Sequence, residues 1–417
     1  MAGSPRPVDR DDTAWLRSVG YLAFIVIGWT GLLAPSLIRS IEADLRQTDT
    51  AIGVYYFLYA VAYASGSLVG GYATERFGRR VVLSSALVLH GLGVVALGIV
   101  PVWPGFLVFA IPAGLGAGEI DGGMNGLFLD LFRAGRGRAL NNLHVFFSVG
   151  AFVAPLVIGR LVDAGVPWRL LFVATGLAIV PIGLGFARLR PPHGRHITDG
   201  PAEGDLVGVP RRLLLRAPLP ALGLAIGAYV ASEVGVSNWL VRFLSDAPLV
   251  TATAALSLFW AGLGVGRIVS ARIADRFDHV RFTVVWAVTA SVALVGAVLV
   301  PVLPLSIALF GGVGFAFGPI FPMIVAIGGE RFPERSAAVG GLLTGCAVIG
   351  GVIYPPIMGP ISDAVGLPVA MFGTALLGFL CAASLLGARS AQEAAVARAG
   401  RAGRGVDGQA MVDVDRF

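Results

Sequence analysis

Long runs of apolar residues, separated by short polar segments, make up most of this chain. A helix needs about 20 apolar residues to cross a hydrocarbon core about 30 Å thick. Twelve runs approach that length, and none alternates every second residue as a membrane β-strand does. We therefore predict an all-α membrane protein with twelve transmembrane helices, near residues 16–38, 51–73, 81–100, 104–129, 140–163, 168–188, 215–241, 250–274, 282–301, 303–328, 336–361 and 367–388.

The composition strengthens this prediction. Of the 417 residues, 56% are hydrophobic and 13% are charged, whereas an ordinary soluble protein has about 25% charged residues. The 58 glycines are typical of helices that pack closely in lipid. Both cysteines, Cys346 and Cys381, fall inside predicted helices, so we predict neither a disulfide nor a metal site, and no cofactor.

The arginines indicate the orientation of the helices. They gather in alternate loops, near residues 76–80, 133–138, 188–216, 272–281 and 331–335. Because loops rich in Lys and Arg stay on the cytoplasmic side, we expect both termini in the cytoplasm and the protein in the cell's inner (plasma) membrane. The net charge of +6 then reflects topology and contact with anionic membrane lipid, and no nucleic-acid partner is predicted.

The two halves of the chain repeat each other at an offset of 200 residues. Because six helices return the chain to its starting side, the repeat predicts two pseudo-symmetric six-helix bundles of parallel orientation. We place them at 15–188 and 213–388, with a cytoplasmic linker at 189–212 and cytoplasmic tails at 1–14 and 389–417, the second disordered. Matching pairs include Gly66 and Gly266, Gly114 and Gly314, Gly118 and Gly318, and Pro155 and Pro355.

One loop carries a family resemblance. The segment Gly71-Tyr-Ala-Thr-Glu75-Arg76-Phe-Gly78-Arg79-Arg80 resembles the signature loop between helices two and three of the major facilitator superfamily, with Glu where Asp is more common. A degenerate copy follows at Asp275-Arg276-Phe277. The resemblance extends from about Trp15 to Ala388, and it implies a secondary transporter that works by alternating access.

Shorter segments look like the fucose:proton-symporter-like branch and related sugar carriers. They are Gly118 to Asn125, Asn142 to His144, and Tyr229 to Trp239. This resemblance implies a monosaccharide-like solute that is carried together with a cation, either a proton or sodium.

Polar residues at membrane depth without a counterpart in the other half are the candidates for solute binding. An ionisable group there is costly and is retained for a reason. Asp121 and Asn125 lie four residues apart and share one helix face, with an acid and an amide suited to sugar hydroxyls. Glu119 points about 200° away from Asp121, so we expect it to meet His144 or Arg267 instead.

Glu233 is the first candidate for carrying the coupled proton, and Glu119 and His144 are further candidates. Arg267 is the only arginine well inside a predicted helix, so we expect a carboxylate partner for it. Each polar group can alternatively belong to a buried pair that only holds helices together. The predicted solute-binding residues are Asp121, Asn125, Tyr229, Asn238 and Trp239.

Charged residues at the cytoplasmic helix ends form a predicted gate. Most of them recur in both halves, which favours a role in the shared architecture or in closing the inner side. These residues are Glu75, Arg76, Arg79, Asp130, Arg133, Asp275 and Arg276.

Secondary transport is favoured over the other functional classes. The chain contains no Gly-x-x-x-x-Gly-Lys-Ser/Thr phosphate loop, no His-Glu-x-x-His and no Gly-x-Ser-x-Gly, so neither an ATP-driven pump nor an enzyme is predicted. Two alternatives stay open. The segment Gly150-x-x-x-Ala154-Pro155-x-x-x-Gly159 resembles the antiporter signature of drug and metabolite exporters, and a solute sensor without transport is the other. We expect a monomer.

Overall fold

The computed structural model describes residues 10–132, 136–189 and 218–414. Within these ranges the chain folds into helices without strands, and twelve spans are long and apolar enough to cross a membrane, which confirms the predicted number. The helices are α1 (Arg10–Gly31), α2 (Leu33–Leu45), α3 (Asp49–Phe77), α4 (Arg79–Ile99), α5 (Trp103–Leu131), α6 (Arg136–Asp163), α7 (Trp168–Phe186), α9 (Pro218–Phe243), α10 (Leu249–Ile273), η3 (Ala274–Arg276), α11 (His279–Leu299), α12 (Leu303–Phe317), α13 (Ile320–Arg331), η4 (Pro333–Arg335), α14 (Ser336–Val365) and α15 (Leu367–Val414).

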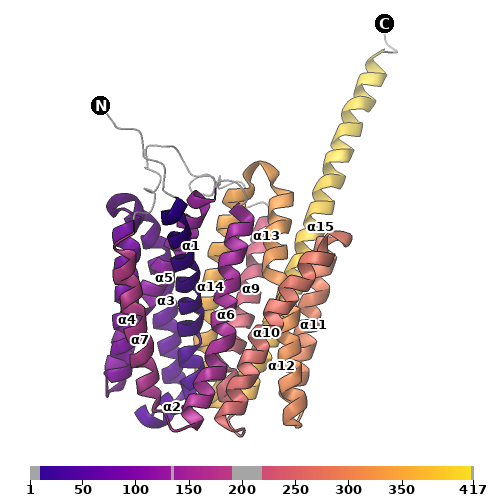
Figure 1. Ribbon diagram of the computed structural model, residues 1–417. Helices are drawn as coiled ribbons and strands as arrows, with labels where there is room; N and C mark the ends of the chain where they lie inside the picture. The colour runs from indigo at the N-terminus through magenta and orange to yellow at the C-terminus, as the bar shows by residue number, and fades with distance from the viewer. Residues whose placement is uncertain (1–9, 133–135, 190–217, 415–417) are drawn as a thin grey trace, which may run out of the picture.

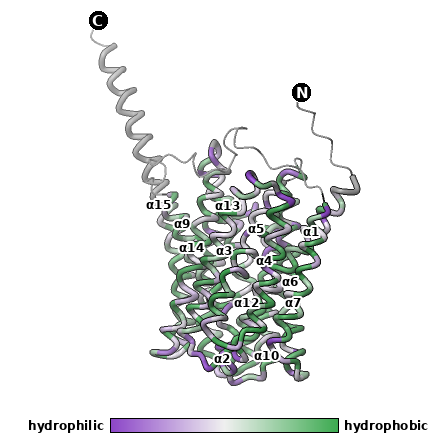
Figure 2. Tube along the Cα trace, turned by 90° about the vertical axis from the view of Figure 1, so that its left-hand side faces the viewer, coloured by the Kyte–Doolittle hydropathy of each residue, from purple (hydrophilic) through white to green (hydrophobic). Residues whose placement is uncertain are grey.

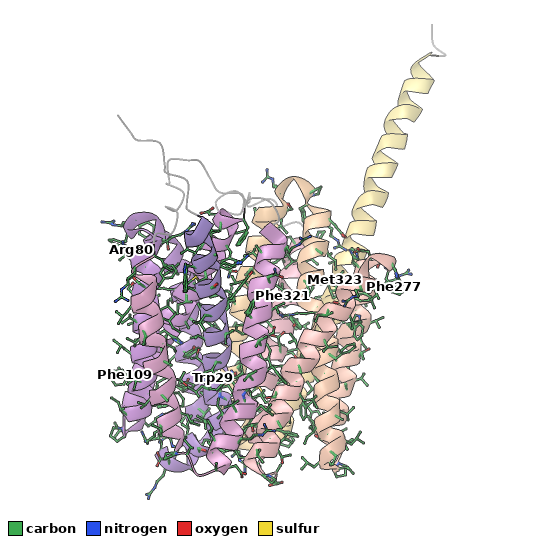
Figure 3. The ribbon with its side chains drawn as sticks, viewed as in Figure 1. Trp29, Arg80, Phe109, Phe277, Phe321 and Met323 are labelled. Atoms are coloured by element: carbon green, nitrogen blue, oxygen red, sulfur yellow. The ribbon has the colours of Figure 1, made fainter. Side chains whose placement is uncertain are left out.

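The helices stand side by side, and the start of α1 and the end of α15 lie at the same end of the bundle (Figure 1). We call this end the terminal face, and the end with the turns at 46–48, 164–167 and 244–248 the far face. Hydrophobic residues predominate along the middle of the bundle, and hydrophilic residues gather toward its two ends (Figure 2). Phe109 projects from the flank (Figure 3), where lipid would cover its exposed ring.

The helix boundaries repeat with the predicted offset. The helices that begin at Asp49, Arg79, Trp103 and Arg136 in the first half have counterparts beginning at Leu249, His279, Leu303 and Ser336 in the second. Each pair of starting positions differs by 200 residues, so the repeat seen in the sequence is also a repeat of structural elements. The predicted linker at 189–212 lies outside the described residues, apart from Leu189.

The repeated glycines explain how the helices approach each other. A Cβ at Gly114 of α5 would lie 2.5 Å from the carbonyl oxygen of Tyr59 in α3. At Gly314 of α12, a Cβ would clash with the carbonyl oxygen of Phe259 in α10, which is the equivalent residue of the other half. Small residues at such contacts let helix backbones pack closely in lipid.

Replacing Gly114 by alanine is expected to destabilise the bundle by about 1–3 kcal/mol, because overpacking forces a backbone shift. The measurement is the thermal unfolding temperature of the purified protein in detergent. Gly264→Ala is the matched control, since a Cβ there has no other atom within 4 Å. Equal unfolding temperatures for the two variants would contradict the close contact.

Prolines divide two of the predicted helices. Pro35 has no N–H, and its ring interferes with the carbonyl group four residues earlier, that of Gly31, so the first span divides into α1 and α2. The helix α2 then continues past the predicted end at residue 38 to Leu45. In the second half, Pro319 lies between α12 and α13 in the same way.

The last helix differs from the expectation for the C-terminal tail. Instead of ending at residue 388, α15 continues as a helix to Val414. Alanine is the strongest helix former, and the segment from Ala391 to Ala402 is rich in it.

Candidate solute site and gates

Asp121 and Asn125 of α5 form the core of a polar cluster inside the bundle. The Nδ2 of Asn125 donates to the Oδ1 of Asp121 at 3.1 Å and to its main-chain carbonyl oxygen at 3.0 Å. Both side chains are partly accessible. Tyr63 of α3 lies within hydrogen-bonding reach of the same carboxyl group, although the sequence analysis did not single it out. The two residues thus share one helix face, as their spacing predicts.

His144 of α6 faces this cluster. Its ring and the Asp121 carboxylate are close enough for their charges to interact. The ring meets Phe24 of α1 edge to face, at 5.3 Å between the ring centroids. His144 therefore connects the acid of α5 with the centre of the bundle.

The second half contributes Arg267 of α10 together with Glu233 and Tyr229 of α9. The Tyr229 hydroxyl donates to Oε2 of Glu233, and the Glu233 carboxylate also feels the charge of Arg267. Among the described residues, Glu233 is thus an acid whose charge interacts with Arg267, although no ion pair joins the two side chains. The guanidinium is partly exposed, and it forms no hydrogen bond to another described residue.

The polar residues around Asp121 in the first half interact electrostatically with those around Glu233 in the second half. Arg267 of the second half interacts electrostatically with His144 of the first. Ionisable side chains whose charges can interact therefore follow one another from Asp121 through His144 and Arg267 to Glu233. We call these four residues the central charge chain.

Three of the predicted site residues lie away from this chain. The backbone of Glu119 packs against Gly70 of α3, whereas its expected partners His144 and Arg267 interact with Asp121 and Glu233. Trp239 is fully buried, and its Nε1 donates to the carbonyl oxygen of Pro355 at 2.9 Å. The carbonyl oxygen of Asn238 accepts from Tyr56 at 3.0 Å near the far face.

The predicted gate residues at the terminal face pair within one half. Arg79 of α4 forms an ion pair with Asp130 of α5, and Arg76 lies over the ring of Phe77. The Glu75 side chain and Arg133 lie outside the described residues. Arg80, labelled in Figure 3 at this end of the bundle, donates to the carbonyl oxygen of Ala187 in the same half.

The second half pairs in a similar way. His279 at the start of α11 lies 2.7 Å from Glu330 of α13 and 3.9 Å from Asp275, measured between ring nitrogen and carboxylate oxygen. Arg276 is exposed beside Asp275. The described contacts of Arg79 and His279 at the terminal face therefore each stay within one half.

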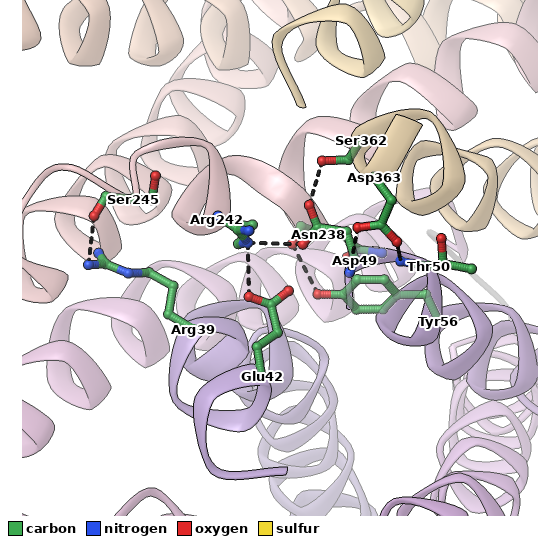
Figure 4. Close-up of polar contacts among 10 residues, drawn as sticks. All are labelled: Arg39, Glu42, Asp49, Thr50, Tyr56, Asn238, Arg242, Ser245, Ser362 and Asp363. Carbon is green, nitrogen blue, oxygen red and sulfur yellow. Dashed lines mark hydrogen bonds and ion pairs between the residues drawn. The ribbon is translucent and has the colours of Figure 1, made fainter. Parts of the chain in front are cut away.

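At the far face, by contrast, an ion-pair network joins the halves. Arg242 of α9 places its Nε 2.9 Å from Oε2 of Glu42 on α2 and 2.9 Å from Oδ1 of Asp49 on α3 (Figure 4). Arg242 belongs to the second half and both acids to the first. Glu42 and Arg242 are also 200 residues apart, so equivalent positions with opposite charge meet each other.

Two further contacts cross between the halves at this face. Asp363 of α14 accepts from the main-chain N–H groups of Asp49 and Thr50, at 3.2 and 2.8 Å, and so caps the N-terminus of α3. Arg39 of α2 donates to the carbonyl oxygens of Ser245 and Ala247, at 2.8 and 2.9 Å (Figure 4). We call Arg39, Glu42, Asp49, Arg242 and Asp363 the far-face latch.

The sequence analysis missed the far-face latch. The predicted end of the first helix at residue 38 placed Arg39 and Glu42 in a loop, and no partner was predicted for Arg242. A usable signal was present, because Glu42 and Arg242 are opposite charges at equivalent positions of the repeat.

Comparisons with known proteins agree with this architecture. The family model described as Major Facilitator Superfamily matches residues 19–353 and, in a second match, 247–409. A glucose/galactose transporter of Brucella abortus is 28% identical over 271 residues, which are 59% of this chain. The chain spans 62% of that relative's length.

Two further matches cover nearly the whole chain. A cis,cis-muconate transport protein of Acinetobacter baylyi is 24% identical over 387 residues, or 87% of this chain and 90% of the relative. The crystal structure of a bacterial homologue of the human lysosomal transporter Spinster, in an inward-facing and unoccupied conformation, superposes with a TM-score of 0.79 at 15% identity and covers 92% of this chain and 98% of that one. This chain therefore belongs to the Major Facilitator Superfamily.

Proposed function

We propose that this protein carries a small polar solute, sugar-like in chemistry, by alternating access coupled to the movement of protons. One observation carries the proposal. The central charge chain is assembled from both halves, so a solute bound there contacts both, and rocking of the halves changes its exposure from one side to the other.

The residues around Asp121 suit a polyhydroxylated solute. Asp121 accepts hydrogen bonds, Asn125 both donates and accepts, and the Tyr63 hydroxyl does both. Arg267 adds guanidinium N–H groups that donate no hydrogen bond to another described residue. The similarity to a glucose/galactose transporter supports a sugar, whereas the cis,cis-muconate relative makes a carboxylate solute the second candidate.

Glu233 is the proposed proton carrier. While ionised, its carboxylate balances the charge of Arg267, and the Tyr229 hydroxyl donates to it. When Glu233 takes up a proton, the guanidinium loses this counter-charge and attracts the oxygen atoms of the solute more strongly. Proton and solute therefore favour each other's binding, which is the coupling that a symporter requires.

The terminal face is proposed to face the cytoplasm. Its loops carry most of the arginines, which remain on the cytoplasmic side. In this orientation, the far-face latch holds the outer side of the transporter closed, while the described ion pairs of Arg79 and His279 leave the inner side unlatched.

Uptake into proteoliposomes tests the proposed function. Purified protein is reconstituted, and accumulation of labelled glucose and galactose is measured under an imposed inward proton gradient. Glu233→Gln is expected to abolish accumulation against a gradient while it retains counterflow exchange, because the permanently neutral side chain no longer couples a proton.

The other outcomes separate the alternatives. Uptake that follows a sodium gradient and ignores protons would overturn proton coupling. Accumulation of muconate without sugar uptake would replace the sugar by a carboxylate. Proton-driven extrusion of a cationic dye would favour the exporter, and the absence of any flux with retained solute binding would favour the sensor.

A further inference from the structure

Two acids of the far-face latch, Glu42 and Asp49, pair with the same arginine, Arg242. The Nε of Arg242 carries a single hydrogen, yet Oε2 of Glu42 and Oδ1 of Asp49 both lie 2.9 Å from it. The Asp49 and Glu42 side chains are only 5% and 11% exposed. Water therefore stabilises their two negative charges very little.

The two acids meet at one guanidinium nitrogen, which brings their carboxyl groups close together. Their carboxyl groups lie within hydrogen-bonding reach of each other, and the second oxygen of Glu42, Oε1, is buried and has no hydrogen-bond partner among the described residues. Two ionised carboxylates that close repel each other, whereas one proton between them turns the repulsion into a hydrogen bond.

The other charged residues of the latch have partners of their own. Asp363 is stabilised as an anion by the N-terminus of α3, and Ser362 donates to Oδ2 of Asp49. Arg39 is engaged with main-chain carbonyls. The charged and titratable groups around the acid pair are Arg39 on α2, Tyr56 on α3, Arg242 on α9, Asp246 after α9, and Asp363 on α14.

We propose that the closed far-face latch is a proton-binding site in which Glu42 and Asp49 share one proton, so that closing this gate takes up a proton and opening it releases one. When the halves separate at this face, Arg242 leaves with the second half, and water reaches both acids. Each acid then ionises independently. This site is distinct from Glu233 and does not depend on which solute is carried.

Linkage fixes the direction of the pH effect. Because the closed state holds the extra proton, a fall in pH at the far face favours closure, by at most about tenfold in the closed-to-open ratio per pH unit for one proton. If the far face is the outer side, external acid drives the transporter toward the state that opens to the cytoplasm.

A distance measurement on the full chain without solute tests this site. In a background with Cys346→Ala and Cys381→Ala, spin labels are attached to Val102→Cys and Val302→Cys. These positions are equivalent in the two halves, and each side chain is 55% exposed at the far face. Pulsed electron paramagnetic resonance in nanodiscs then measures the distances between the two spin labels, and these give the closed and open populations. The measurement covers about pH 5 to about pH 9, a range in which a shared carboxyl proton titrates.

The expected result is a closed population that falls as pH rises, and that stays high and independent of pH in Glu42→Gln. Asp49→Asn gives the same result if Glu42→Gln fails to fold. Asp44→Asn is the matched control, since Asp44 also lies on α2 but pairs with Arg169 of its own half, and it keeps the parent's pH dependence. So does Glu233→Gln.

Two outcomes would overturn the proposal. A parent without pH response would show that closing takes up no proton, and an unchanged response in Glu42→Gln would place the proton elsewhere. Because the measurement uses no solute, its failure leaves the sugar-transport proposal to be judged by the uptake assay alone.

Discussion

Replacing Arg267 by glutamine is expected to lower solute uptake by at least about 100-fold, which corresponds to about 2.7 kcal/mol. Arg267 is a member of the central charge chain, and its replacement removes the positive charge that interacts with the Glu233 carboxylate. The variant also loses the donors that we assign to the solute. Initial uptake rates in proteoliposomes measure the effect.

The control for this prediction is Arg272→Gln. Arg272 lies on the same helix near the terminal face, where it donates to the carbonyl oxygen of Ile268, and its replacement is expected to leave uptake within about twofold, as is usual for exposed charges. In the double variant with Glu233→Gln, thermal stability should recover because the unpaired acid is gone, whereas uptake should remain low. If Arg267→Gln takes up solute at the parent's rate, Arg267 does not belong to the proposed solute site.

The second large effect is expected for Arg242→Gln, which leaves Glu42 and Asp49 without their cation. The far-face latch then loses its ion pairs between the halves, and the closed population at this face should fall by at least about tenfold, since a buried pair broken on one side costs several kcal/mol. Uptake should fall with it, because a carrier that cannot close one gate cannot complete the cycle. The spin-label distances and the uptake assay both measure this.

Arg169→Gln provides the comparison for the latch. Arg169 also lies at the far face and also pairs with an acid of α2, at 2.9 Å from Asp44, but both residues belong to the first half. Its replacement removes an ion pair of the same kind without separating the halves, so the closed population should stay near that of the parent. If Arg242→Gln and Arg169→Gln lowered the closed population equally, the effect would reflect a general loss of stability and not the loss of contacts between the halves.

The local features of this protein could be predicted because each depends on one stretch of chain. A helix in lipid must satisfy its own backbone hydrogen bonds and present apolar side chains over its whole length, so twelve spans are visible from hydropathy alone. The repeat is equally visible, because Gly114 and Gly314 must be small for the same reason. The shared face of Asp121 and Asn125 follows from helical spacing.

Pairing between distant helices had to come from the tertiary structure. The sequence indicates that Arg267 needs an acid and that Glu233 is costly at membrane depth, but only the packing of α9 beside α10 brings the two together. It equally separates Asn238 and Trp239 from the central charge chain, although they follow Glu233 on the same helix.

The sequence by itself therefore determined the membrane class, the number of spans, the twofold repeat and the list of costly polar groups, since these follow from the chemistry of single helices in lipid. Only the tertiary structure decided which of these groups meet, and which face is latched. Arg242 is 193 residues from Asp49 along the chain, and nothing local to either residue specifies a contact that exists only when two bundles close against each other.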